Sequence, residues 1–152
     1  MDSAPRPALV PDDYPQLVAV WRTAVRATHD FLTPADGDAI EAALIPSYFP
    51  NVSLHVLEEN GHILGFSGVA DSTLEMLFVD AAARGSGVGR ILLCHAISQL
   101  SVTRVDVNEQ NDQAFGFYLH HGFTVTGRSD LDGDGRPYPL LHLTLDHDPV
   151  EA

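Results

Sequence analysis

The chain has 152 residues, of which 45% are hydrophobic and 19% charged, a composition typical of one globular domain spanning residues 1–152. Its 21 acidic residues outnumber eight basic residues, all arginine, and the net charge of −13 argues against nonspecific nucleic-acid binding, which requires cations to neutralise phosphates. No apolar run approaches the roughly 20 residues of a membrane span, and the N-terminus lacks a signal-peptide pattern, so we expect no membrane association.

The N-terminal half is predicted to form one strand, two helices and a three-stranded meander. Asp12 or Asp13 can cap the first helix, and Thr33, followed by proline, is typical of the start of the second. Asn60-Gly61 is a strong hairpin signal between two alternating segments. The predicted bounds are 5–10 for the first strand, about 13–28 and 34–48 for the helices, and 53–58, 62–70 and 74–79 for the following strands.

The C-terminal half is predicted to add two helices and three strands. A helix follows a glycine-rich loop and ends near Leu100, with Val88, Ile91, Leu92 and Ala96 on its buried face. The remaining predicted elements are a strand at 104–107, a helix at 111–121 and strands at 123–130 and 138–146. The resulting order, βααβββαβαββ, indicates a mixed α/β sheet flanked by helices.

The single cysteine, Cys94, excludes an internal disulfide framework and suits a reducing compartment. We therefore expect a cytoplasmic protein, and we expect Cys94 to be buried in its apolar helix. No bound metal is expected either. The segment "DLDGDG" (130–135) begins like a calcium loop, but Leu141 occupies the twelfth position, where that motif has glutamate. A hairpin turn is the better interpretation.

The sequence of the glycine-rich loop "RGSGVGR" (84–90) does not match several known phosphate-binding and catalytic motifs. The dinucleotide fingerprint needs a third glycine where Arg90 stands, and a P-loop needs a lysine, which the chain lacks. A nucleophile elbow needs G-x-S-x-G, whereas Ser86 lies in Gly-Ser-Gly. Free amides at a helix N-terminus, with Arg84 and Arg90 beside them, would suit a pyrophosphate. The loop alone is equally compatible with a tight turn that serves only packing.

A second motif favours the pyrophosphate interpretation. Residues 111–123 read N-x-x-A-x-x-F-Y-x-x-x-G-F, about 20 residues after the loop. Arg84, Gly87 and Gly89 match the pattern [QR]-x-x-G-x-[GA]. Together, the two segments resemble the GCN5-related N-acetyltransferase (GNAT) family, and the predicted element order agrees with that family's mostly antiparallel fold over nearly the whole chain.

The resemblance implies transfer of an acetyl group from acetyl-CoA to a primary amine of a small molecule or protein, by direct attack and without a covalent enzyme intermediate. Tyr118 matches the family's proton donor to the leaving sulfur. Glu75 is the first candidate for the base that deprotonates the amine, and His142 is the second. The residues implied in cofactor binding are Phe78, Val79, Arg84, Gly85, Ser86, Gly87, Val88, Gly89, Arg90, Asn111 and Phe117.

The acceptor pocket is expected between the first two helices and the late strands, where Trp21, His29, Phe31, Tyr138 and His142 could line it. The identity of the acceptor stays open, as does the choice between a monomer and a homodimer. A second hypothesis is a non-catalytic acyl-CoA sensor or interaction module with the same fold. The presence of both Tyr118 and Asn111 favours an enzyme.

Overall fold

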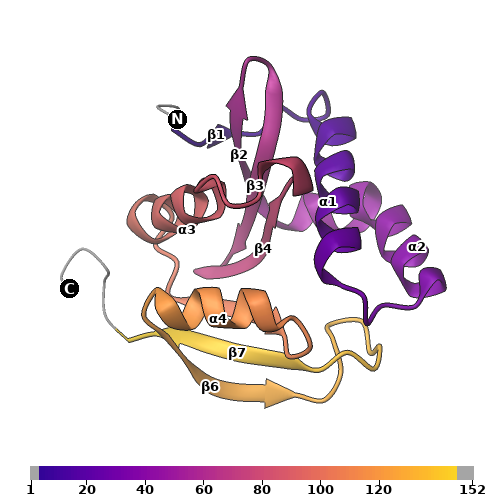
Figure 1. Cartoon of the computed structure of the whole chain (residues 1–152), viewed down its shortest axis with the longest axis vertical. Helices are drawn as coiled ribbons and strands as arrows, with labels where there is room; N and C mark the ends of the chain where they lie inside the picture. Colours follow the sequence, from indigo (N-terminus) through magenta and orange to yellow (C-terminus); the bar gives the residue numbers. More distant parts are fainter. Residues whose placement is uncertain (1–3, 147–152) are drawn as a thin grey trace.

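The computed structural model describes residues 4–146, in which seven strands form one mixed sheet with helices on both faces (Figure 1). The strand order is β1-β2-β3-β4-β5-β7-β6, and among these described strands only β4 and β5 pair in parallel. The elements are β1 (Arg6–Pro7), α1 (Tyr14–Thr28), α2 (Pro34–Ala43), β2 (Ser53–Glu59), β3 (His62–Ala70), β4 (Thr73–Val79), α3 (Val88–Gln99), β5 (Arg104–Asn108), α4 (Asp112–His120), β6 (Phe123–Ser129) and β7 (Leu140–Leu145). The predicted order and fold class are confirmed.

Several element ends differ from the predictions for local chemical reasons. The second helix leaves α-geometry after Ala43 and continues as a π-helical turn, where Pro46 has no amide hydrogen to give to the α-helical ladder. Tyr138 lies outside β7, because the prolines on either side of it cannot donate to a neighbouring strand. Asp13 occupies the cap position of α1, but its carboxylate accepts from Arg6 and from the Leu9 amide.

Three hydrophobic clusters of buried side chains fill the core of the described part of the chain. In Figure 1, α1 and α2 lie on one side of β2–β4 and α3 lies on the other, while α4 packs over β6 and β7. Trp21, which we considered for the acceptor pocket, is only 6% exposed and belongs to the cluster beneath α1. The prediction for Cys94 is wrong: it is exposed, because α3 buries only the stripe of Val88, Leu92, Leu93 and Ala96.

Strands β4 and β5 separate soon after they meet. Their parallel pairing consists of Thr73 with Arg104 and Leu74 with Val105, and it then stops. A bulge coincides with this point, since Val69 of β3 faces Leu74 whereas Gly68 faces Met76, which leaves Glu75 as an extra residue. The two strands therefore diverge from Glu75 onward, and the edge of β4 that faces β5 is left without a strand partner there.

Candidate active site

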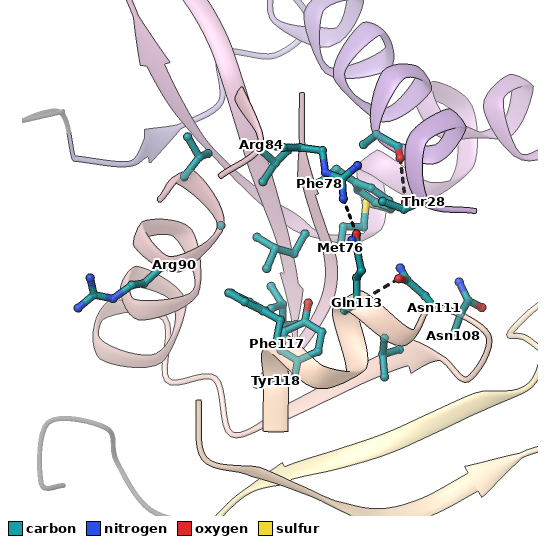
Figure 2. Close-up of a pocket in the computed structure, with 18 of the residues that line it drawn as sticks. Thr28, Met76, Phe78, Arg84, Arg90, Asn108, Asn111, Gln113, Phe117 and Tyr118 are labelled. Carbon is teal, nitrogen blue, oxygen red and sulfur yellow. Dashed lines mark hydrogen bonds between the residues drawn. The ribbon is translucent and has the colours of Figure 1, made fainter. Parts of the chain in front are cut away.

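A cavity of about 430 Å³ opens where β4 and β5 diverge. Its walls are the two strands, the end of α1, the loop before α3 and the first turns of α4 (Figure 2). Most of the residues that the sequence suggested are on these walls: His29, Glu75, Phe78, Val79, Arg84, Gly85, Gly87, Val88, Gly89, Arg90, Asn111, Phe117 and Tyr118. The structure thus brings together segments that are far apart in the chain.

The glycine loop ends one side of the cavity with free backbone amides. Gly87 is the N-cap of α3 and has φ +90°, a left-handed conformation that other residues rarely adopt. Its carbonyl accepts the first helical bond, from the Ile91 amide at 3.0 Å, so the amides of Val88 and Gly89 have no acceptor within the helix. Together with the helix dipole, these amides suit an anion such as a pyrophosphate.

Gly89 leaves space that the protein does not use for packing. A Cβ atom added there would meet only Val79 Cγ2 at 3.7 Å and Phe117 Cζ at 3.8 Å, which are ordinary contacts. Ser86, by contrast, turns away from the cavity wall and donates its hydroxyl to the Ala83 carbonyl. The packing of the fold therefore does not require a glycine at position 89.

The two arginines of the loop lie differently. Arg84 extends across the cavity and its Nη2 donates to Gln113 Oε1 on α4, whereas Arg90 points away from the cavity in Figure 2. Gln113 was not singled out in the sequence, although it lies two residues after Asn111 within the same motif. The bond between Arg84 and Gln113 joins the loop to α4 over the cavity.

Asn111 and Tyr118 reach the cavity from opposite ends of α4. Asn111 caps the helix, its Oδ1 accepting from the Ala114 amide at 3.2 Å, which leaves its amide nitrogen for another partner. Tyr118 is only 5% exposed and its ring packs against Phe117 and Phe123. Burial raises the pKa of Tyr118 above its ordinary value of about 10, so the phenol holds its proton at neutral pH.

Glu75 lies at the apex of the split between the strands. Partial burial and, after it, the charges of Asp106 and Asp71 raise the pKa of Glu75 above its ordinary range. A higher pKa makes a carboxylate a stronger proton acceptor near neutral pH. Asp106, which sequence analysis did not select, lines the same cavity from β5. No sequence pattern identifies Asp106, because the pairing of its strand decides whether it lies at the gap between β4 and β5.

The other candidates for the acceptor pocket are an aromatic group of three residues and His142, which lies outside the cavity wall. His29, Phe31 and Tyr138 form a chain of rings, with centroids 5.1 Å and 6.0 Å apart. Burial lowers the pKa of His29 to about 4, so its ring is neutral at pH 7. The Tyr138 hydroxyl joins the Thr33 amide, at 3.2 Å, to Asp36 and thereby fixes the start of α2. His142 lies behind Asp106 and does not reach the cavity wall.

The structure also bears on a metal site and on a membrane-spanning helix. Within residues 4–146, no group of three or more histidine, cysteine or acidic side chains is arranged to hold a metal ion. No helix in this part of the chain is long and apolar enough to cross a membrane.

The cavity wall combines the free amides of a helix start with a protonated phenol and a carboxylate, a set of groups that suits an enzyme moving an acyl group from a phosphate-bearing thioester. The family follows from comparison. Residues 24–137 match the model described as an acetyltransferase (GNAT) domain, and the chain belongs to this family of N-acetyltransferases, which use acetyl-CoA as the acetyl donor.

Individual relatives agree with this assignment. The chain is 45% identical over 129 residues to peptidyl-lysine N-acetyltransferase YjaB of Escherichia coli K12, covering 84% of this chain and 87% of that protein. The solution structure of apo YjaB superposes with a TM-score of 0.84, at 41% identity, covering 94% and 97% of the two chains. The PaiA N-acetyltransferase of Thermoplasma acidophilum in complex with coenzyme A shares the fold, with a TM-score of 0.65 at 18% identity and coverage of 92% and 98%.

Proposed function

We propose that this N-acetyltransferase acts on the ε-amine of lysine in other proteins. The observation that carries the proposal is the 45% identity, over most of both chains, to an enzyme named as a peptidyl-lysine N-acetyltransferase. The electrostatics are compatible with it. A lysine side chain arrives as an ammonium, and both the net charge of −13 and the carboxylates at the apex of the cavity attract a cation.

The donor would lie along the cavity from the glycine loop to the apex. The amides at the start of α3, together with Arg84, would hold its pyrophosphate. The unpaired edge of β4 at Phe78 and Val79 offers backbone groups to the amides of its pantetheine arm, and Asn111 offers a side-chain amide. When bound, acetyl-CoA supplies the acetyl group as an activated thioester.

Two side chains would move protons. Glu75 accepts a proton from the acceptor ammonium, since its raised pKa brings its basicity closer to neutral pH. Tyr118 donates its proton to the departing sulfur, since its phenol is protonated and buried at the cavity wall. Backbone amides on the free edge of β4 can stabilise negative charge that develops on the carbonyl oxygen.

The acceptor is tested by incubating the protein with acetyl-CoA and a short peptide that carries one lysine and a blocked N-terminus. We expect CoA release and a peptide heavier by one acetyl group, whereas the same peptide with arginine in place of lysine should not react. Because the chain contains no lysine, an acetyl-lysine signal can only come from the substrate. CoA release with small amines but with no lysyl peptide or protein would overturn the peptidyl-lysine proposal and leave the acetyltransferase assignment intact.

The cellular setting is part of the proposal. We propose that the protein works in the cytoplasm as a monomer or homodimer, without nucleic-acid or membrane partners. The acidic surface and the exposed thiol of Cys94, which suits a reducing compartment, support this setting.

A further inference from the structure

Asp106 lines the cavity but has no part in the proton transfers described above. It follows directly after the two backbone pairs that join β5 to β4, so it lies where the strands part. Glu75 lines the cavity at the same place from β4. Asp106 and Glu75 follow directly after Val105 and Leu74, respectively, the last backbone pair between the strands, and the charge of Asp106 contributes to the raised pKa of Glu75. One end of the cavity therefore carries two acidic groups from two different strands.

A chain of hydrogen bonds across the sheet holds Asp106. His142 is its direct neighbour on β7, and the distance from His142 Nδ1 to Asp106 Oδ1 is 2.7 Å. On the other side of the ring, His142 Nε2 lies 2.7 Å from Ser129 Oγ on β6. An ionised carboxylate can only accept, so Nδ1 carries the hydrogen in the bond to Asp106, and the Ser129 hydroxyl, which can donate or accept, is the partner of Nε2.

This arrangement fixes one carboxylate oxygen and leaves the other for a ligand. Oδ1 of Asp106 is bonded to His142, while Oδ2 has no hydrogen-bond partner among residues 4–146. The surrounding charges reinforce a negative potential. Glu75 and Asp71 are acidic, and Arg104, two residues earlier on β5, directs its Nη2 to the Asp71 carbonyl oxygen at 2.9 Å.

We propose that Asp106 binds the ammonium group of the acceptor and makes the enzyme select cationic amines over neutral ones, with His142 and Ser129 as positioning residues. The inference rests on the proposed function, in which the acceptor arrives as an ammonium. Such a group has three donors, and the carboxylates of Glu75 and Asp106 offer charge-assisted acceptors on two sides of it. Glu75 then takes its proton, and Asp106 keeps the nitrogen in place.

The protons balance in this scheme. The ammonium gives one proton to Glu75, which releases it to solvent, and the free amine attacks. As the N–C bond forms and the C–S bond breaks, Tyr118 protonates the sulfur. The proton that then leaves the new amide nitrogen replaces the one lost by Tyr118.

The test compares two acceptors that differ in charge, a lysyl peptide and an arylamine that is neutral at pH 7.5. For Asp106→Asn we expect the KM of the lysyl peptide to rise about 10- to 100-fold, the effect of losing one charge-assisted hydrogen bond. The kcat should stay within about threefold, a range small enough to exclude loss of acid–base catalysis. The KM of the arylamine and the Kd of acetyl-CoA should stay within about twofold, because neither makes this ion pair. Glu75→Gln should instead lower kcat with the lysyl peptide.

Variants of His142 separate positioning from general damage. His142→Ala should raise the KM of the lysyl peptide, and His142→Gln, whose side-chain amide can still donate to Asp106, should recover most of the loss. Ser129→Ala should have a smaller effect than His142→Ala, since it leaves the bond to Asp106 intact. An equal loss with both acceptors in Asp106→Asn, or an unchanged KM for the lysyl peptide, would overturn the proposal.

The proposal can also fail separately from the assignment of a lysine acceptor. If no lysyl peptide reacts, the same comparison is made with propylamine as the cationic acceptor, and a rise in its KM in Asp106→Asn would still support the role of Asp106. A wild-type enzyme that uses the neutral arylamine more efficiently than every cationic amine would refute that role while remaining an acetyltransferase.

Discussion

At the scale of single residues, Tyr118 has the two properties that a proton donor to a leaving thiolate requires. Its ring is packed between Phe117 and Phe123, which fixes the direction of the hydroxyl, and the residue lines the cavity. Burial, which raises its pKa, keeps it protonated over the pH range in which the enzyme would work. The hydroxyl is thus separable from the packing, because phenylalanine preserves the ring.

We therefore expect Tyr118→Phe to lower kcat by about 10²- to 10³-fold, the usual contribution of general acid catalysis. The Kd of acetyl-CoA should change by less than about twofold, since the ring contacts remain. CoA release and calorimetric titration measure the two quantities. Tyr48→Phe is the matched control, because the Tyr48 hydroxyl is bonded to Asp134 outside the cavity. A large loss of affinity in Tyr118→Phe would instead assign the hydroxyl to donor binding.

At the scale of elements, the start of α3 carries a glycine that lowers its helical stability. Gly89 lies in the first turn of the helix, and glycine inside a helix is less favourable than alanine by roughly 0.5–1 kcal/mol. The surrounding contacts at 3.7 and 3.8 Å would admit a methyl group. The fold alone would therefore tolerate alanine here, whereas a donor phosphate close to the backbone would not.

Gly89→Ala should leave the free energy of unfolding unchanged or raise it by up to about 1 kcal/mol. It should weaken acetyl-CoA binding by at least about tenfold, because the methyl group occupies the space next to the free amides. Urea denaturation and calorimetry measure the two effects. Gly116→Ala in α4 is the control, since an added Cβ there meets nothing within 4 Å and lies outside the cavity. Unchanged acetyl-CoA affinity in Gly89→Ala would contradict the assignment of the loop.

Elements with local signals were predictable, and contacts between distant elements were not. β3 spans the predicted residues, and its start is set by the hairpin turn in which Asn60 and Gly61 adopt the required positive φ angles of 53° and 80°. The glycine loop and the helix that starts at Asn111 carry their motifs within a few residues. Asp106 could not be identified from the sequence. Its position at the cavity depends on the point where β5 diverges from the bulged strand β4, and its orientation depends on His142, which lies 36 residues later on β7.

The burial of side chains was predictable only in part, since Val88, Leu92 and Ala96 are buried as expected whereas Cys94 is not. Trp21 and Cys94 both lie on helices with apolar residues, yet the first is in the core and the second is exposed. Which stripe of a helix is buried depends on the layer that covers it, and periodicity alone leaves the edges of that stripe undefined.

At the scale of the whole molecule, the partly buried His29 makes stability depend on pH. Burial lowers the pKa of His29 to about 4, whereas the unfolded chain has the ordinary value of 6.5. Above pH 6.5 the His29 ring is neutral in both the folded and the unfolded state, so its lowered pKa does not reduce the free energy of unfolding there. As the pH falls from 6.5 to about 4, His29 binds a proton in the unfolded state but remains mostly neutral in the folded state, so the free energy of unfolding decreases.

We expect the free energy of unfolding of the wild type to fall by about 1–3 kcal/mol more than that of His29→Phe between pH 7.5 and pH 4. Urea denaturation at a series of pH values measures the difference. Any effect of phenylalanine on packing is already present at pH 7.5, where the imidazole is neutral in both states, so that measurement is the reference. Parallel curves for the two proteins over this range would show that His29 is not the cause.

The short parallel ladder between β4 and β5 has a consequence for how the molecule opens. Two backbone pairs connect the β1–β4 part of the sheet to the β5–β7 part. The cluster beneath α1 lies within the first part, whereas the cluster around Val105 and Phe123 also takes in Val69 of β3 and Leu74 of β4. Without the donor, the amides of the two parts should exchange with deuterium at separate rates, as two cooperative units. Acetyl-CoA lying between β4 and β5 would connect the two strands where their backbone pairing stops. Saturation with acetyl-CoA would then merge the two units and slow exchange on both sides of the gap.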